Sequence, residues 1–241
     1  METITLKDLK SGVDPGMIAD FFEFLFRNCN GGFFPVAKYT APTECETFWC
    51  DVSNGFRDLT ESICADENRI HHSWQFWKVL FAAPIGKLER LSAQKVGILS
   101  YSATQLERII GLPCLWIDVD EILPDLEERL TKFRITPSIR LKTSPRGFHF
   151  YWILKNPATV CDFNTVCNAQ VKLVRLLGGD LERCHFGGSS RIPGLLNFGY
   201  RPPHFIDYEV TDLEYRLEDF DRLPYVYWVD FVKRFFSLTN K

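Results

Sequence analysis

The sequence predicts a chain of the α/β (α+β) class, with a mixed sheet flanked by helices. Two observations predict the sheet: the apolar run Leu115–Val119, and two alternating runs on either side of a turn at Ser144–Gly147. A third predicts the helices, because apolar residues recur at helical spacing over Asp162–Leu177, before a Gly178-Gly179 stop. Strands and helices therefore follow one another through the second half of the chain.

Length and composition set the outer limits. The chain has 241 residues, 46% of them hydrophobic and 15% aromatic, which excludes a disordered chain and allows a sizeable core. No apolar run has the length of a membrane span, and the first ten residues do not resemble a signal peptide. We therefore expect a cytoplasmic protein without a membrane partner, whose eight cysteines are free thiols.

The first hundred residues predict a smaller α/β module. We expect one helix from Met1 to about Gly32, and within this range Asp14-Pro15 has the residue types of an N-cap and first helical position. The stretch Phe33–Asp66 looks irregular, and the many aromatic residues here are expected to fill the core, with base stacking as the alternative. The further elements expected are strands over Trp74–Ala83 and Gln94–Tyr101 and a short helix over Ser102–Ile110, closed by Gly111-Leu112-Pro113. We divide the chain into an N-terminal module, residues 1–105, packed as one compact unit on a second module, residues 106–241.

Two aspartates in the apolar run indicate a metal site. In a strand, Asp118 and Asp120 project from one face while Leu115, Ile117 and Val119 cover the other. Two carboxylates this close repel each other unless a cation lies between them, and oxygen ligands favour Mg²⁺ or Mn²⁺. The alternative is a strand that ends in solvated acidic residues.

The hairpin after this strand indicates an anion-binding face. If Ser144 lies opposite Gly147, then Lys142 lies opposite His149. Arg140 and Tyr151 then share that face, while the apolar residues of both strands share the other. Seven Lys or Arg and no acid occur from residue 129 to residue 155, which suits a polyanionic partner, although a solvated basic face is the alternative.

The remaining segments offer a third acid and a basic loop. Asp180 follows the glycine stop of the 162–177 helix, where the chain re-enters the sheet, or simply follows a helix C-cap. The segment Ser189–Asn197 is a turn-rich loop with a short strand, in which Arg191 is either a ligand contact or an ordinary loop cation. A tail helix is expected over Leu223–Phe236. Buried small apolar side chains are the simpler interpretation of the cysteines, with zinc binding as the alternative. Two sets of residues could bind zinc: Cys45, Cys50 and Cys64 with His71 or His72, and Cys161, Cys167 and Cys184 with His185.

Three motifs now stand in order: Asp118-Val119-Asp120, Ser144-Pro145-Arg146-Gly147-Phe148-His149, and Asp180 followed by Ser190–Asn197. Their order and spacing resemble the archaeo-eukaryotic primase superfamily, in particular the primase-polymerases of plasmids, phages and related mobile elements. The resemblance covers roughly Trp74 to Tyr208. Pro145-Arg146 stands where many relatives have small residues, which puts the phosphate contacts of this turn in doubt.

The resemblance implies a catalytic module with an RRM-like mixed sheet, and specific roles for its residues. Asp118, Asp120 and Asp180 would hold two Mg²⁺ or Mn²⁺ ions. His149 would bind a phosphate of the incoming nucleotide, beside Ser144 and Arg146 at the turn, or would be a structural strand histidine. Weaker nucleotide or template contacts are implied for Lys142 and Asn197, and a triphosphate contact for Arg191.

The resemblance thus implies a template-dependent nucleotidyltransferase that primes or extends DNA, acting on dNTP or NTP and a single-stranded or primed template. A catalytically silent nucleic-acid-binding or replication-accessory module on the same fold is the first alternative. Another metal enzyme with an Asp-x-Asp strand, such as a nucleotide cyclase or a sugar-nucleotide transferase, is the second. The sequence has no phosphate-binding loop of a helicase, so unwinding would require a separate helicase or other replication protein.

Overall fold

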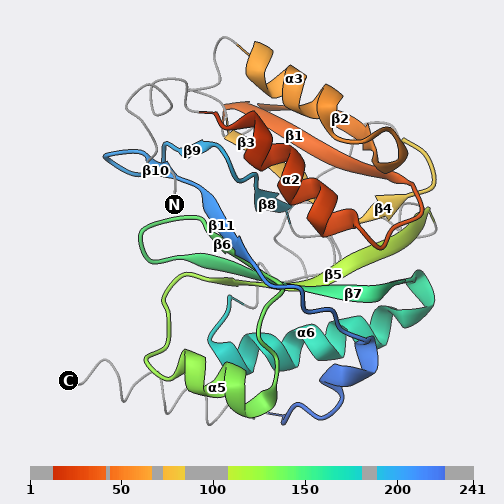
Figure 1. Ribbon diagram of the computed structural model, residues 1–241, viewed down its shortest axis with the longest axis vertical. Coiled ribbons are helices and arrows are strands. Elements are labelled where there is room, and N and C mark those ends of the chain that lie inside the picture. Colours follow the sequence, from red (N-terminus) through yellow and green to blue (C-terminus); the bar gives the residue numbers. More distant parts are fainter. Residues whose placement is uncertain (1–12, 42–43, 67–72, 85–107, 181–188, 226–241) are drawn as a thin grey trace.

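A computed structural model describes residues 13–41, 44–66, 73–84, 108–180 and 189–225 (Figure 1). The helices of this part are α2 (Pro15–Phe26), α3 (Arg57–Ala65), α5 (Leu126–Phe133) and α6 (Phe163–Leu177), with short 3₁₀ turns η1 (Val52–Asn54), η2 (Val160–Asp162) and η3 (Leu217–Phe220). The strands are β1 (Phe33–Ala41), β2 (Glu44–Asp51), β3 (Ser73–Trp77), β4 (Leu80–Phe81), β5 (Ile109–Val119), β6 (Ile139–Lys142), β7 (Phe148–Ala158), β8 (Ser189–Arg191), β9 (Leu196–Asn197), β10 (His204–Phe205) and β11 (Asp207–Val210).

Nine of these strands form one sheet in the order β11-β6-β7-β5-β4-β1-β3-β8, with β2 paired to β1. Strands β9 and β10 form a separate pair. Every pair of named strands in the described residues is antiparallel, and one isolated parallel bridge joins Leu154 to Tyr215. Because the short strand β4 pairs with both β1 and β5, the sheet continues across residue 105, the expected module boundary. The division into two modules stays a prediction.

Two hydrophobic cores lie on the two faces of the strand pair β5–β7. One core packs α5 and α6 against the face that carries Ile117, Phe150 and Trp152. The other packs α2 and α3 against β1, β3 and the opposite face of β5–β7, which carries Trp116 and Tyr151 (Figure 1). This α+β architecture confirms the predicted fold class. Among the described helices, none is long and apolar enough to cross a membrane.

Helix α2 confirms the predicted start and corrects the predicted length. The Asp14 carboxylate accepts a 3.0 Å hydrogen bond from the Met17 amide, and Pro15 occupies the first turn. The expected helix over residues 1–32 is wrong at both ends of the described part. Val13 already forms a β-bridge with Leu195, and the helix ends at Phe26.

Several other expectations need correction. The stretch Phe33–Asp66, expected to be irregular, forms the hairpin β1–β2 and helix α3. Pro35, expected to mark a turn, lies within β1. The strand expected over Trp74–Ala83 is two strands separated at Lys78-Val79. The expected helix over Ser102–Ile110 is wrong at its end, because Ile109-Ile110 and the closing Gly-Leu-Pro belong to β5. Residues 94–101 and most of the tail helix lie outside the described residues.

The β6–β7 register differs by one residue from the prediction. Leu141 lies opposite His149, and Lys142 lies opposite Phe148. The cause is the turn, where the Ser144 hydroxyl accepts a 2.7 Å hydrogen bond from the Gly147 amide and so replaces a backbone partner. The predicted basic face is therefore wrong: Arg140 lies on the α5 face, where it binds both carboxylate oxygens of Glu127 at 2.6 and 2.9 Å.

Candidate active site

Asp118 lies near the end of β5, on the face opposite Ile117 and Val119, as the strand alternation predicts. This face packs against α2. The cross-strand neighbour of Asp118 is His149 of β7, and His149 Nε2 lies 3.3 Å from Asp118 Oδ1. Both residues are largely buried, with 4% and 6% of their surfaces exposed. This pair is the centre of the candidate site.

A chain of hydrogen bonds supports the other side of the His149 ring. Its Nδ1 lies 2.6 Å from the Ser190 hydroxyl oxygen, and the same oxygen also contacts the Tyr151 hydroxyl. Ser190 belongs to β8 at the far end of the sheet order, so the sheet must curve to bring β8 next to β7. No pattern in the sequence singles out Ser190, which was noted only as a neighbour of Arg191.

The protonation state of this chain follows from burial. Burial lowers the pKa of His149 despite the opposing effect of Asp118, and burial raises the pKa of Tyr151 well above its usual value. A neutral histidine has one N–H, and the nitrogen facing a carboxylate must carry it. All three hydrogen bonds therefore run in the same direction: the Tyr151 hydroxyl donates to the Ser190 hydroxyl, Ser190 donates to His149 Nδ1, and His149 Nε2–H donates to Asp118.

Asp180 lies beside Asp118 because two backbone segments touch. The Asp180 amide donates a 2.8 Å hydrogen bond to the Asp118 carbonyl oxygen. The preceding residue must be glycine for this approach, since a Cβ on Gly179 would lie 3.0 Å from the same carbonyl oxygen. Helix α6 ends just before, at Gly178 with a φ of +78°. The backbones of two acidic residues that are distant in sequence are thus joined at this point.

Asp120 and the β6–β7 turn lie at the end of β5. Asp120 is exposed and follows Val119, the last residue of β5, which pairs with Phe148. The turn approaches closely, because a Cβ on Gly147 would lie 2.7 Å from the Ser144 hydroxyl oxygen and 3.6 Å from the Val119 carbonyl oxygen. Ser144 therefore shapes the turn.

The four remaining predicted residues are spread around this centre. Arg191 of β8 donates to the Ser73 hydroxyl, and its charge helps to lower the pKa of His149, so it lies near the ring. Asn197 is buried and donates a 2.8 Å hydrogen bond to the Thr143 carbonyl oxygen, which braces the turn. Arg146 is exposed at the tip of the turn. The register places Lys142 on the face opposite His149.

Lys78 is a neighbour of the site that the sequence analysis missed. Its side chain has no exposed surface, and its Nζ lies 3.4 Å from the centre of the Trp116 ring. Its charge acts on His149, lowering its pKa, and on the thiol of Cys114. One signal marked it: Lys78 is the one charged residue within the run Trp74–Ala83.

The three predicted acids have the ligand chemistry of a site for a hard divalent cation, but their described side chains do not form a closed metal site. Asp118, Asp120 and Asp180 supply carboxylate oxygens only, which is the chemistry that Mg²⁺ and Mn²⁺ prefer. Within the described ranges, no group of three or more His, Cys, Asp or Glu side chains is close enough together to hold a metal ion. Both proposed zinc sets include residues outside those ranges, so zinc stays an untested possibility.

Comparison with known proteins places the fold. No protein-family model and no curated protein matches the sequence. Among solved structures, the chain is similar to the primase-polymerase domain of cyanophage S-2L, with a TM-score of 0.57, 14% identity, and coverage of 88% of this chain and 100% of that domain. It is also similar to the catalytic domain of the primase RepB′ in complex with initiator DNA, with a TM-score of 0.56, 9% identity, and coverage of 93% and 98%.

A second structure of RepB′ is similar over 92% of this chain and 64% of that one, with a TM-score of 0.54 and 8% identity. The similarity extends over 88–93% of this chain, which is more than the stretch Trp74–Tyr208 over which the motifs gave a resemblance. The chain therefore has the fold of the archaeo-eukaryotic primase-polymerases, as the three motifs predicted.

Proposed function

We propose that the protein is a template-dependent nucleotidyltransferase that joins nucleotides to a 3′-hydroxyl, with release of pyrophosphate, in the replication of a plasmid, phage or other mobile element. The observation that carries the proposal is the backbone hydrogen bond from Asp180 to Asp118, next to His149. It unites the first and third predicted acids on a fold shared with primase-polymerases.

The metal site would consist of Asp118, Asp120 and Asp180. Two Mg²⁺ or Mn²⁺ ions bound there would activate the 3′-hydroxyl and neutralise charge on the triphosphate and the leaving pyrophosphate. Because phosphoryl transfer depends mainly on position and charge, the protein's own task is to hold these three carboxylates in one geometry. Gly179 contributes by allowing the Asp180 segment to touch β5.

His149 would donate its Nε2–H to a phosphate oxygen of the incoming nucleotide. The chain Tyr151–Ser190–His149 keeps the proton on Nε2, the nitrogen that faces the site. The present contact of Nε2 to Asp118 is 3.3 Å, longer than the usual 2.7–3.2 Å, so a phosphate oxygen can replace it at low cost. Arg191 would add positive charge near the triphosphate, and Arg146 would reach it from the turn, which Ser144 and Asn197 keep in shape. Lys142 lies on the other face, so we assign it no role.

The decisive experiment is incubation with a primed DNA template, labelled dNTPs and Mn²⁺, followed by measurement of chain growth. We expect incorporation by the natural protein and its loss in Asp118→Ala, Asp120→Ala and Asp180→Ala. Asp212→Ala, which removes an exposed carboxylate far from these residues in sequence, is the matched control. The same assay on unprimed single-stranded DNA, with and without ribonucleotides, separates priming from extension.

A catalytically silent DNA-binding module is the second candidate, because the described carboxylates do not form a metal-binding group as placed. One solved relative of the same fold was captured with initiator DNA. This candidate predicts DNA binding without nucleotide incorporation, and binding that is unchanged in the three aspartate variants. Fluorescence anisotropy of a labelled template, measured on the same protein samples, distinguishes the two candidates.

A further inference from the structure

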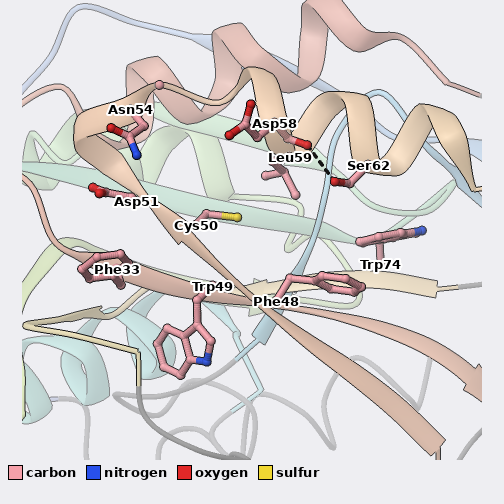
Figure 2. A pocket seen from close by; sticks show the side chains of 11 residues that line it. Phe33, Phe48, Trp49, Cys50, Asp51, Asn54, Asp58, Leu59, Ser62 and Trp74 are labelled. Atoms are coloured by element: carbon pink, nitrogen blue, oxygen red, sulfur yellow. Dashed lines mark hydrogen bonds between the residues drawn. The ribbon is translucent and has the colours of Figure 1, made fainter.

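A cavity on the N-terminal part of the fold is not used by the proposed reaction. It has a volume of about 350 Å³ and lies between β2 and α3, with contributions from β1, η1 and β3 (Figure 2). Its lining residues are Phe33, Phe48, Trp49, Cys50, Asp51, Asn54, Gly55, Asp58, Leu59, Ser62 and Trp74. None of them belongs to the candidate active site, so this cavity is a separate feature.

Aromatic rings form part of the lining. Phe48 is stacked on Trp74, with ring centres 5.6 Å apart and an angle of 27° between the planes. Figure 2 shows both rings on the side of β2 that faces α3, while Trp49 points to the other side. Phe48 keeps 37% of its surface exposed, an unusual amount for a ring of its size inside a pocket. The cavity therefore offers the exposed ring of Phe48 to a guest, with the buried ring of Trp74, 4% exposed, behind it.

The polar part of the lining is acidic. Asp51 and Asp58 stand at the cavity, and no Lys or Arg is among its lining residues. The Asp58 charge contributes to raising the pKa of the Cys50 thiol, so the carboxylate acts on the cavity interior. One carboxylate oxygen of Asp51 accepts a 2.9 Å hydrogen bond from the Ser53 amide, which caps η1. The second oxygen can accept a hydrogen bond from a guest.

The surroundings reinforce this charge. Lys38 is balanced by Glu46 at 3.5 Å and Asp66 at 3.7 Å, and Arg57 is paired with Glu61 at 2.7 Å. With Asp51 and Asp58, these groups amount to two cations against five acids. A phosphate or a nucleic-acid backbone is repelled here, whereas a cation is attracted. Lys38 Nζ already lies 5.9 Å from the centre of the Trp74 ring, which shows that this ring can face a cation.

We propose that this cavity binds the side chain of an arginine in a basic peptide segment of a partner protein. A guanidinium group is planar, so it stacks on aromatic faces, and its donors bind carboxylates in pairs. An aromatic wall with two carboxylates and no Lys or Arg in the lining matches both properties. The inference goes beyond the proposed nucleotidyltransferase activity, since it concerns a contact between proteins on a different part of the surface.

Protection of Cys50 provides a local test. Cys50 lines the cavity and Cys161 is exposed elsewhere, so alkylation of the two thiols can be followed separately by mass spectrometry of peptides. Burial raises the pKa of Cys50 to about 12, so labelling must be run slowly at mildly alkaline pH. The probe is acetyl-Gly-Arg-Gly-amide, and its neutral match is the same peptide with citrulline in place of arginine.

We expect the arginine peptide to slow labelling of Cys50 but not of Cys161, with a dissociation constant on the order of 1 mM for a single side chain. The citrulline peptide should not protect. Asp58→Asn should weaken binding about tenfold, since it removes one of the two carboxylates. Glu61→Gln, in the same helix and outside the cavity, should weaken binding by less than about twofold, because the exposed Glu61 charge is screened by solvent.

Equal protection of Cys50 by the citrulline peptide would overturn the proposal. The absence of protection by the arginine peptide, at a concentration tens of times the expected dissociation constant, would overturn it as well. Protection by a nucleoside such as guanosine, with none by arginine, would assign the cavity to a nucleobase and reject a protein partner. The comparison of the two peptides needs no variant, so it decides the matter even if Asp58→Asn fails to fold. Primer extension by Asp58→Asn should equal that of the natural protein, which separates this test from that of the proposed enzyme activity.

Discussion

Replacement of Gly179 by alanine tests the contact that unites the two distant acids. A Cβ at this position would lie 3.0 Å from the Asp118 carbonyl oxygen and 3.4 Å from Ile117 Cβ. Both neighbours belong to the central strand β5, which is buried on both faces and cannot move aside easily. The segment with Asp180 must therefore retreat by about 0.4 Å to restore an ordinary contact distance of 3.4 Å.

That retreat lengthens the hydrogen bond between the Asp180 amide and the Asp118 carbonyl oxygen from 2.8 to about 3.2 Å, the long limit for such a bond. Crowding and the weakened bond together should cost about 2 kcal/mol of unfolding free energy. For a chain of this size, that corresponds to a fall in Tm of about 4–8 °C. Displacement of one metal-binding carboxylate should reduce primer extension by on the order of tenfold to a hundredfold.

Gly111→Ala is the matched control, because Gly111 lies in β5, the strand that Gly179 contacts, and its Cβ would meet ordinary contacts at 3.5 Å or more. Thermal unfolding and primer extension are measured on both variants and on the natural protein. The reasoning fails if Gly179→Ala retains both the Tm and the activity of the natural protein. A fall in Tm with full activity would show that the contact matters for folding alone and would remove Asp180 from the proposed site.

Three further predictions concern hydrogen bonds, charge and thiols. Ser190→Ala should lower stability by about 1–3 kcal/mol in urea unfolding, and Tyr151→Phe by less, since only the first leaves two buried groups without a partner. Glu127→Gln should cost about 0.5 kcal/mol at neutral pH, because this exposed carboxylate pairs with an arginine that lowers its pKa; the difference should vanish as pH falls through that lowered pKa. Alkylation of Cys114, whose pKa burial raises to about 12, should be far slower at pH 8 than that of the exposed Cys161.

Local patterns in the sequence predicted the parts of the fold that local chemistry determines. The capped start of α2 at Asp14, the glycine stop after α6 and the alternation in β5 are all found in the structure. The hairpin β1–β2 was missed because Pro35 and Pro42 suggested turns. Pro35 lies between the pairing of Val36 with β3 and the pairing of Phe33 with β4, at a gap on that side of β1, and a local pattern does not reveal such a gap.

Part of the candidate site could not be predicted because it depends on how the sheet curves. Ser190 contacts His149 from β8, which is separated from β7 by several strands in the sheet order, and the charge of Lys78 acts on His149 from the break between β3 and β4. Sequence spacing carries information about neighbours along a strand or helix, but not about strands that meet through curvature. The acids of β5 and their approach to Asp180 were accessible, because a strand and the glycine stop of a helix leave local signals.

The register of β6–β7 shows how one side chain can redirect a whole face. The predicted pairing placed Ser144 opposite Gly147, but the Thr143 amide donates to the Gly147 carbonyl oxygen at 3.1 Å while the Ser144 hydroxyl accepts from the Gly147 amide, and the strands are shifted by one residue. This shift moves Arg140 and Lys142 away from His149. The β5–β7 pairing makes His149 the strand partner of Asp118, and the observed β6–β7 register leaves the face around this pair without Arg140 and Lys142. A carboxylate that lacks such a fixed hairpin cation keeps its charge available for a divalent ion, which makes the observed register more suitable for metal binding than the predicted one.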